Sequence, residues 1–394
     1  MVALPQQRNL PDMKHILLFI PGYLPGYKSG GPVRTVANLV EALGDEFLFN
    51  VVCLDRDSGD TAPYGSVIKG QWNRQGKAKV FYIKRGIFGV ISLISIIRNT
   101  QFDIVHLNSF LSFQFSVLPL LMVRILRPQA VIFLGPRGEF SLGALSLKAF
   151  KKRVFITVSR WIGLHKNVIW HASTSFEAQD IKRVMGESAV LRTAIDLAMT
   201  GNDVEPAVRV SEAPLRVVFI SRISPKKNLI GALSLLQSIC REIHFDVYGP
   251  IDDEAYWTAC QETATLLPSN IVFTYCGTLQ PSEVVPTLVK YDLFFFPTFG
   301  ENFGHVIAEA LFAGLPILIS DTTPWRHLDQ MKLGWDIPLD QPDRFIACIE
   351  ECYAKPAGEY AKWRCDIRQW ALANIGGHGA IEENRVLFNN PIKM

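Results

Sequence analysis

Two glutamates flank the start of one predicted helix, in the stretch PTFGENFGHVIAEALFAGLP at residues 297–316. Glu301 stands just before the helix, where the helix dipole favours a negative charge. Glu309 lies a little over two turns further on, among alanines and aliphatic residues that are typical of a packed face. A buried carboxylate without a partner is costly, so we expect a polar group to meet it. Carboxylates accept hydrogen bonds well from hydroxyls, and a sugar would supply these.

Two further loops carry residues that suit a phosphate. The stretch SRISPKKN places Arg222 and Lys227 at the end of an apolar strand, where two cations fit a pyrophosphate, although surface salt bridges would also explain them. The stretch KSGGP places Gly30 and Gly31 at a helix start, where backbone N–H groups can approach an anion. An ordinary tight turn is the alternative. Together with the glutamates, these loops predict a ligand with both a diphosphate and sugars.

Alternating strands and helices must position these loops. Apolar runs such as HILLFIP, FDIVHLN, LRVVFIS and LFFFP alternate with helical stretches, which predicts parallel sheets covered on both faces. A chain of 394 residues exceeds one ordinary core, and the polar stretch 200–214 is typical of a linker. We therefore expect an α/β protein with two Rossmann-like, doubly wound domains, at residues 1–205 and 206–375. The loops after their strands should line a cleft between them.

The three loops resemble those of glycosyltransferase family 4. PTFGENFGHVIAEALFAGLPILISD is similar to that family's signature of Glu, seven residues and Glu, FISRISPKKN to its Arg-to-Lys loop, and SGGP to its N-terminal glycine loop. Their order and spacing match from about Met13 to the C-terminus. The resemblance implies the GT-B fold, a nucleotide diphosphate sugar as donor, retention of anomeric configuration, and neither a cofactor nor a required metal. It also implies that a final helix, within residues 376–394, packs back on the first domain.

The resemblance assigns roles at the donor site one residue at a time. Glu309 should hold the ribose hydroxyls, and Glu301 the hydroxyls of the transferred sugar. Arg222 and Lys227 should stabilise the leaving diphosphate, so that little covalent chemistry is needed. Further donor contacts are expected from Gly30, Gly31, Thr278, Leu279, Asn302, Phe303 and Gly304.

A second set of residues is expected near the reacting sugar and the acceptor. The family often has His-x-His after the strand that reads FDIVHLN here, and this chain has His106 and Asn108. Asn108 can donate a hydrogen bond but cannot carry a proton, and His106 fits either a catalytic role or the core. LGPRGEFSLGALSLK resembles a loop of bacterial polysaccharide-assembling members, in which Arg137 and Glu139 would face the acceptor. That likeness implies a saccharide acceptor, lipid-linked and made for a surface polysaccharide.

Composition and missing motifs narrow the alternatives. The net charge of +3 gives no overall attraction to nucleic acid. The sequence has no GxGxxG and no GxxxxGK, so neither dinucleotide redox chemistry nor P-loop hydrolysis is indicated. The DRD at residues 55–57 could hold a metal, but it lacks a supporting cluster. Seven cysteines without a CxxC pair, with no signal peptide and no long apolar span, predict a cytoplasmic protein.

The segment at residues 148–166, KAFKKRVFITVSRWIGLHK, mixes cations with aromatic residues. One explanation is a solvated helix face. The alternative is a face on which Lys151, Lys152 and Arg153, beside Phe150 and Trp161, rest on an anionic membrane surface. The second interpretation predicts a peripheral protein on the inner face of the cytoplasmic membrane.

Two other functions fit parts of the same pattern. Another GT-B enzyme, such as a sugar-nucleotide epimerase or a phosphorylase, would share the donor loops. A phosphorylase usually needs a pyridoxal lysine, which no motif indicates, and an epimerase would act on the donor alone. A non-catalytic sugar-binding protein of the same fold would not need Arg222, Lys227, Glu301 and Glu309 together. A retaining glycosyltransferase is the prediction that uses all four.

Overall fold

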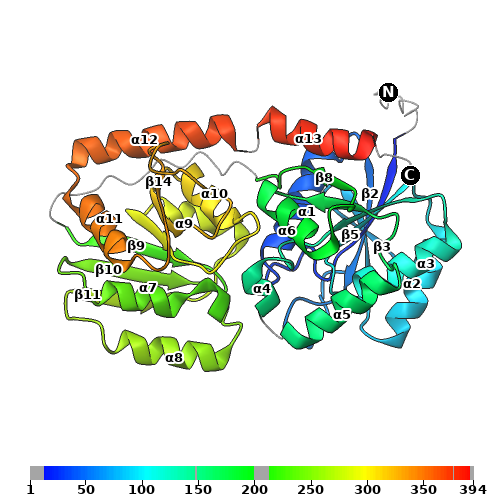
Figure 1. Ribbon diagram of the computed structural model, residues 1–394, viewed down its shortest axis with the longest axis horizontal. Coiled ribbons are helices and arrows are strands. Elements are labelled where there is room, and N and C mark those ends of the chain that lie inside the picture. Colours follow the sequence, from blue (N-terminus) through cyan, green and yellow to red (C-terminus); the bar gives the residue numbers. More distant parts are fainter. Residues whose placement is uncertain (1–12, 147–148, 199–212, 376, 391–394) are drawn as a thin grey trace, which may run out of the picture.

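The computed structural model describes residues 13–146, 149–198, 213–375 and 377–390. They form two α/β domains that lie side by side (Figure 1), each built on its own sheet. The predicted two-domain, doubly wound architecture is confirmed. Of the expected linker at residues 200–214, only Ala213 and Pro214 lie within the described residues. No helix in the described ranges is long and apolar enough to cross a membrane.

The first domain has an eight-stranded sheet that is parallel except at one edge. In spatial order its strands are β3 (Trp72–Gln75), β4 (Ala78–Ile83), β2 (Leu48–Leu54), β1 (His15–Phe19), β5 (Ile104–Asn108), β6 (Val131–Gly135), β7 (Ile169–Ala172) and β8 (Leu191–Thr193). The antiparallel edge strand β3 differs from the expected parallel pattern. It arises because Gly76, with φ at +56°, turns the chain directly back into β4.

Alternate residues of β1 pack into separate cores on the two faces of this sheet. Leu17 and Phe19 pack with residues of α2 (Ile87–Asn99), α3 (Leu118–Leu126) and α6 (Ser175–Met185), whereas Ile16 and Leu18 pack with residues of α1 (Gly31–Leu43) and of the final helix. The helices of the first domain are α1 (Gly31–Leu43), α2 (Ile87–Asn99), the π-helix η1 (Phe113–Val117), α3 (Leu118–Leu126), α4 (Leu142–Ser146), α5 (Ala149–Trp161) and α6 (Ser175–Met185).

The second domain has a six-stranded, wholly parallel sheet. Its strands in spatial order are β11 (Ile271–Tyr275), β10 (Ile243–Tyr248), β9 (Leu215–Ile220), β12 (Leu293–Phe296), β13 (Ile317–Ser320) and β14 (Gly334–Ile337). Its helices are η2 (Pro225–Lys227), α7 (Leu229–Leu236), α8 (Glu254–Ala264), η3 (Pro281–Glu283), α9 (Val284–Leu288), α10 (His305–Phe312), α11 (Pro342–Ala354) and α12 (Ala357–Asn374). The central strand β12 is buried along its whole length, as its sequence LFFF predicts.

The last two helices run along one side of both domains (Figure 1). α12 packs against α10 of the second domain, whereas α13 (His378–Asn389) packs against α1 and β8 of the first. The Phe388 ring of α13 lies 5.6 Å from that of Phe47 and 6.2 Å from that of Phe49. Lys14 Nζ donates to the Phe388 carbonyl oxygen at 3.0 Å. α13 therefore completes the core of the first domain.

Candidate active site

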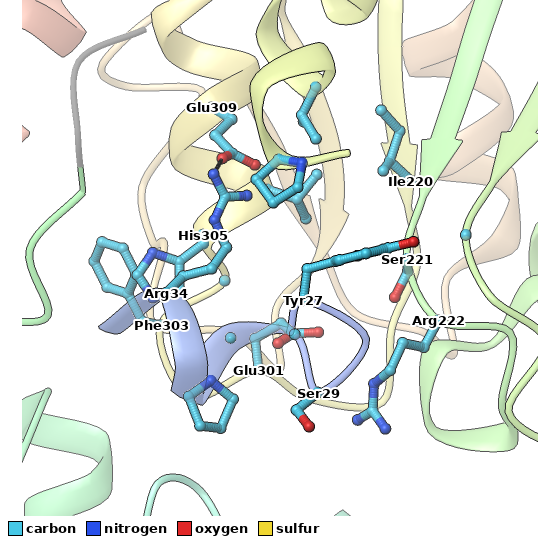
Figure 2. A pocket seen from close by; sticks show the side chains of 18 of the residues that line it. Tyr27, Ser29, Arg34, Ile220, Ser221, Arg222, Glu301, Phe303, His305 and Glu309 are labelled. Atoms are coloured by element: carbon cyan, nitrogen blue, oxygen red, sulfur yellow. Dashed lines mark ion pairs between the residues drawn. The ribbon is translucent and has the colours of Figure 1, made fainter. Parts of the chain in front are cut away.

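A cavity of about 320 Å³ lies between the two domains (Figure 2). It is lined by loops that follow β1, β9, β10, β11 and β12, at the strand ends where open parallel sheets bind ligands. The cavity gathers most of the site residues predicted from the sequence. These are Gly30, Gly31, Arg137, Arg222, Lys227, Thr278, Leu279, Glu301, Asn302, Phe303, Gly304 and Glu309.

The glycine loop enters the cavity at the start of α1. Gly30 has φ at +70°, a conformation that other residues rarely adopt. α1 begins at Gly31, so the partial positive charge of its N-terminus meets the cavity. Asp57 holds the loop in place, because its Oδ2 accepts from the backbone N–H groups of Tyr27 at 2.8 Å and Lys28 at 3.1 Å. The loop is thus preformed to receive an anion.

The DRD motif supports this loop. Asp55 Oδ1 accepts from Arg56 Nε at 2.8 Å, while Asp57 is engaged by the glycine loop. In the described ranges, no group of three His, Cys, Asp or Glu side chains is placed to hold a metal ion. The burial and the contacts of Asp57 explain an acidic residue here without a metal.

Lys227 and Glu301 form an ion pair at the cavity wall, and both side chains are 13% exposed. Asn228 brings their loops together, because its Nδ2 donates to the Pro297 carbonyl oxygen at 2.8 Å. Its Oδ1 also caps α7. Arg222 pairs with Asp252 at 2.9 Å and is more exposed. Arg222, Lys227 and Glu301 therefore line the cavity to which the family resemblance assigns a diphosphate sugar.

Glu309 is buried, with 5% of its surface exposed. It forms an ion pair with Arg34, which reaches across from α1 of the other domain (Figure 2). Burial raises the pKa of Glu309 to about 7, although the Arg34 guanidinium opposes this rise. Glu309 Oε2 has no hydrogen-bond partner among the described residues. A buried carboxylate oxygen at the cavity wall is thus left open to a hydroxyl donor.

A buried polar chain also joins the domains. The Thr35 hydroxyl donates to Asp196 Oδ2 at 2.8 Å, and Asp196 Oδ1 accepts from Arg137 Nη1 at 2.9 Å. Because its only proton is given to Asp196, Thr35 must accept from His305 Nε2, at 2.9 Å. Burial lowers the pKa of His305 to about 3, so the ring is neutral and protonated on Nε2. His305 is thereby fixed at the start of α10.

A smaller cavity of about 150 Å³ adjoins the first one and contains the residues predicted near the acceptor. Asn108, Arg137 and Glu139 line it, and Arg137 lines both cavities. Arg137 Nε donates to Asn108 Oδ1 at 3.0 Å. Glu139 already has hydrogen-bond partners within the first domain, because its carboxylate accepts from Ser109 Oγ at 2.7 Å and from two backbone N–H groups. Glu139 thus shapes the loop after β5.

His106 lies outside both cavities, in the core. Its Nε2 lies 3.1 Å from His171 Nδ1, and His171 Nε2 donates to the Ala194 carbonyl oxygen at 3.1 Å. The carbonyl fixes the His171 proton on Nε2, so His106 Nε2 must donate to His171. Burial lowers the pKa of His106 well below its usual range. The structure therefore does not place His106 at the reacting sugar, which corrects its assignment as a catalytic residue.

Asn302 lines the cavity, but its side chain joins the domains. The amide contacts Ser173 Oγ at 2.6 Å, and with its nitrogen toward Glu177 it donates to Oε1 of that residue at 3.2 Å. The approach is close, because a Cβ atom on Gly138 would lie 2.9 Å from Asn302 Cβ. The assignment of Asn302 to the donor therefore concerns its backbone.

Sequence reasoning did not assign Arg34, Thr35 or His305 to the site. All three line the cavity, and each makes a contact between domains. The local signal was present for Arg34, which follows Gly31 by three residues and so lies within one turn of the helix start. For Thr35 and His305, the separation of 270 residues left no local pattern to detect.

Residues 204–369 match the family described as Glycosyl transferases group 1. The second domain is a group 1 glycosyl transferase domain. It contains Arg222, Lys227, Glu301 and Glu309, which are the charged residues of the second domain assigned to the donor. No protein with curated annotation matches the sequence of the chain.

Solved structures with low sequence identity share the fold of the whole chain. Sucrose-phosphate synthase from Thermosynechococcus elongatus superposes with a TM-score of 0.72 at 14% identity, covering 96% of this chain and 98% of that one. HepE from Anabaena, solved with UDP-glucose, superposes with a TM-score of 0.66 at 13% identity, covering 95% of this chain and 98% of that one. WaaG, a glycosyltransferase of lipopolysaccharide biosynthesis, superposes with a TM-score of 0.64 at 12% identity, covering 95% of this chain and 100% of that one. The group 1 glycosyl transferase domain thus forms the second half of a GT-B fold.

Proposed function

We propose that the protein is a family 4 enzyme that transfers a sugar from a nucleotide diphosphate sugar to a saccharide acceptor, with retention of anomeric configuration. One observation carries this proposal: a single cavity between the domains brings together the carboxylates of Glu301 and Glu309, the cations Arg222 and Lys227, and a helix N-terminus. Hydroxyls and a diphosphate are the ligand groups that match this set. Because HepE was solved with UDP-glucose, uridine nucleotides are the first donors to test.

In this proposal the protein's own groups stabilise the leaving nucleotide. Glu309 would bind the ribose hydroxyls and Glu301 those of the sugar. Lys227, Arg222 and the N-terminus of α1 would meet the charge that develops on the diphosphate, and fixed charges in a closed site are effective at this. Because these groups supply the positive charge, the reaction should need no metal ion.

The acceptor would approach from the smaller cavity. Arg137 lines both cavities, so it lies between the proposed donor and acceptor. Asn108 beside it offers an amide for hydroxyls but no ionisable proton. These groups suit a saccharide, and we propose a lipid-linked one that is extended during surface polysaccharide assembly on the inner face of the cytoplasmic membrane.

A transfer assay tests the proposed function. UDP-, GDP- and ADP-sugars would be incubated with the protein and a lipid-linked saccharide, with and without excess chelator. We expect transfer both with and without chelator. NMR of the product should show that the anomeric configuration of the donor is retained. Activity that is lost in chelator and restored by magnesium or manganese would contradict metal independence. An epimer formed from the donor alone would favour the epimerase alternative.

The surface of α5 supports a membrane-bound location. Phe150, Val154, Val158 and Trp161 recur at helical spacing and are all exposed, with Phe150 at 80% and Trp161 at 86%. This apolar stripe faces away from the core of the first domain, whereas Phe155, on another side of α5, packs against that core. Exposed cations lie beside the stripe at positions 151, 153 and 160. Lys148, the first cation of the expected segment, lies outside the described residues. The helix therefore has the surface of an interfacial helix.

Replacing Lys151 and Arg153 with glutamate should weaken binding to anionic vesicles. Each cation near an anionic surface contributes about 1 kcal/mol, so reversing two charges should lower the partition coefficient by at least tenfold. Sedimentation with phosphatidylglycerol vesicles at increasing salt would measure this. The matched control reverses two exposed lysines of the second domain, Lys290 and Lys362. Equal binding by both variants, or none by the parent, would leave α5 as a solvated face.

A further inference from the structure

Each carboxylate assigned to the donor is already paired with a cation. Glu301 pairs with Lys227 within the second domain, and Glu309 pairs with Arg34 across the cleft. All four side chains line the same cavity. A diphosphate sugar carries the two kinds of group that could separate these pairs, since its hydroxyls donate to carboxylates and its phosphates attract cations.

In the Arg34–Glu309 ion pair across the cleft, only one of the two carboxylate oxygens has a partner. Glu309 is buried, and its Oε2 has no hydrogen-bond partner among the described residues, so one Arg34 contact leaves half of the carboxylate unmet. A pair of vicinal ribose hydroxyls could donate to both oxygens. Arg34 can leave more easily, because 29% of its side-chain surface is exposed. Exchange of Arg34 for hydroxyls would therefore improve the hydrogen bonding of the buried partner.

The position of Arg34 gives it a second partner. It stands in the first turn of α1, beside the glycine loop and the helix N-terminus that suit an anion. Figure 2 shows Arg34 and Glu309 together at one end of the cavity, with Arg222 apart from them near Ser29. The phosphate esterified to the ribose would lie between these two ends. A guanidinium released from Glu309 is thus close to where that phosphate must pass.

We propose that Arg34 is a donor-binding residue that changes partners, holding Glu309 in the empty cleft and the ribose-linked phosphate once the ribose has taken Glu309. This proposal rests on the proposed function. It makes Arg34 a contact through which the first domain senses a nucleotide bound to the second. The alternative is a structural role, in which Arg34 only ties the domains together.

The two roles differ in how they depend on phosphate. Arg34→Met keeps the length of the side chain and removes its charge. If Arg34 binds phosphate, this variant should lose about ten- to a hundredfold in affinity for a nucleoside diphosphate, the range for a charge-assisted hydrogen bond. Affinity for the nucleoside without phosphates should stay the same or rise, because the competitor for Glu309 is gone. Arg34→Lys, which keeps the charge, should recover much of the diphosphate affinity.

The nucleotide to use is whichever of UDP, GDP and ADP raises the melting temperature of the parent protein most. Calorimetry would measure the affinity for this nucleotide, and ligand-observed NMR would measure the affinity for its nucleoside. Arg385→Met, which breaks the exposed pair of Arg385 with Glu46, is the matched control and should change neither affinity. Parallel losses for nucleoside and diphosphate, or no loss for either, would overturn the exchange and leave a structural tie. A parent protein that binds none of the three nucleotides would instead overturn the proposed function on which this inference rests.

Discussion

Replacing Glu309 with glutamine is expected to weaken binding of the nucleotide donor by about ten- to a hundredfold, because a hydrogen bond to a charged group contributes roughly 1.5–3 kcal/mol. The carboxylate is buried at the cavity wall with Oε2 unpartnered, so it can accept from ribose. Glutamine has the same shape but only one acceptor oxygen. The fold should survive, because the change removes a buried charge and the partly exposed Arg34 can turn to solvent. Isothermal titration with the nucleotide sugar would measure the loss.

The pH dependence of binding provides an independent check on Glu309. Its pKa is raised to about 7 by burial, so the carboxyl is protonated below this pH and ionised above it. Only the ionised form accepts two hydrogen bonds from ribose, and affinity should therefore rise between about pH 6 and pH 8. His305 nearby has its pKa lowered to about 3 and stays neutral in this range. The Glu309→Gln variant should lose the dependence.

A matched control for this prediction is Glu262→Gln, which changes an exposed glutamate of the same domain and should leave binding unaltered. If Glu309→Gln binds the nucleotide sugar as tightly as the parent, Glu309 does not hold the ribose. The ion pair with Arg34 would then be its whole role.

The sequence was sufficient to predict one half of the site because that half is local. Lys227 and Glu301 each follow a strand of one sheet, and parallel strands bring their carboxyl ends to one edge. The glycine loop was recognisable for the same reason. Strand and helix periodicity also predicted both sheets. The antiparallel β3 was missed because a four-residue edge strand carries too little pattern.

The other half of the site depends on how the domains meet, which no local pattern encodes. Arg34 and Glu309 are 275 positions apart in the sequence and belong to different cores. His106 was ambiguous because a histidine after a buried strand suits a core and a site equally. The His171 contact and complete burial settle its position, and the contact comes from β7, which lies two strands away in the sheet. Tertiary packing therefore decides which polar residues reach the ligand.

The contacts between the domains make the cleft narrow at the glycine loop. Arg34 pairs with Glu309, Thr35 bonds His305, and the Asn302 amide meets Ser173. All three lie beside the same cavity, so a ligand there touches both domains at once. If the proposed transfer takes place there, product must leave by separation of these contacts, and the width of the cleft would then determine turnover.

Replacing Gly31 with leucine should depress turnover about a hundredfold, while the affinity for the nucleoside, whose proposed ligand Glu309 lies in the second domain, should change only a few-fold. A Cβ atom at Gly31 would lie 3.7 Å from His305 Cδ2, which is ordinary contact, so the matched control Gly31→Ala should be active. The longer leucine side chain would extend into His305 and hold the domains apart. Its backbone would not be strained, because Gly31, unlike Gly30, has no positive φ.

The size of this effect follows from geometry: a displacement of about 1 Å at a reacting centre can lower the rate by about 10²-fold. The nucleotide would still bind through its proposed ligands in the second domain, Arg222, Lys227 and Glu309, and would lose only what Arg34 contributes. Steady-state kinetics and calorimetry would separate these effects, and small-angle scattering with nucleotide should give a larger radius of gyration for the leucine variant than for the parent. Full activity of Gly31→Leu with an unchanged radius would show that the glycine loop is only a turn. A loss of activity in Gly31→Ala as well would instead show that the loop backbone, and not the width of the cleft, is what the reaction requires.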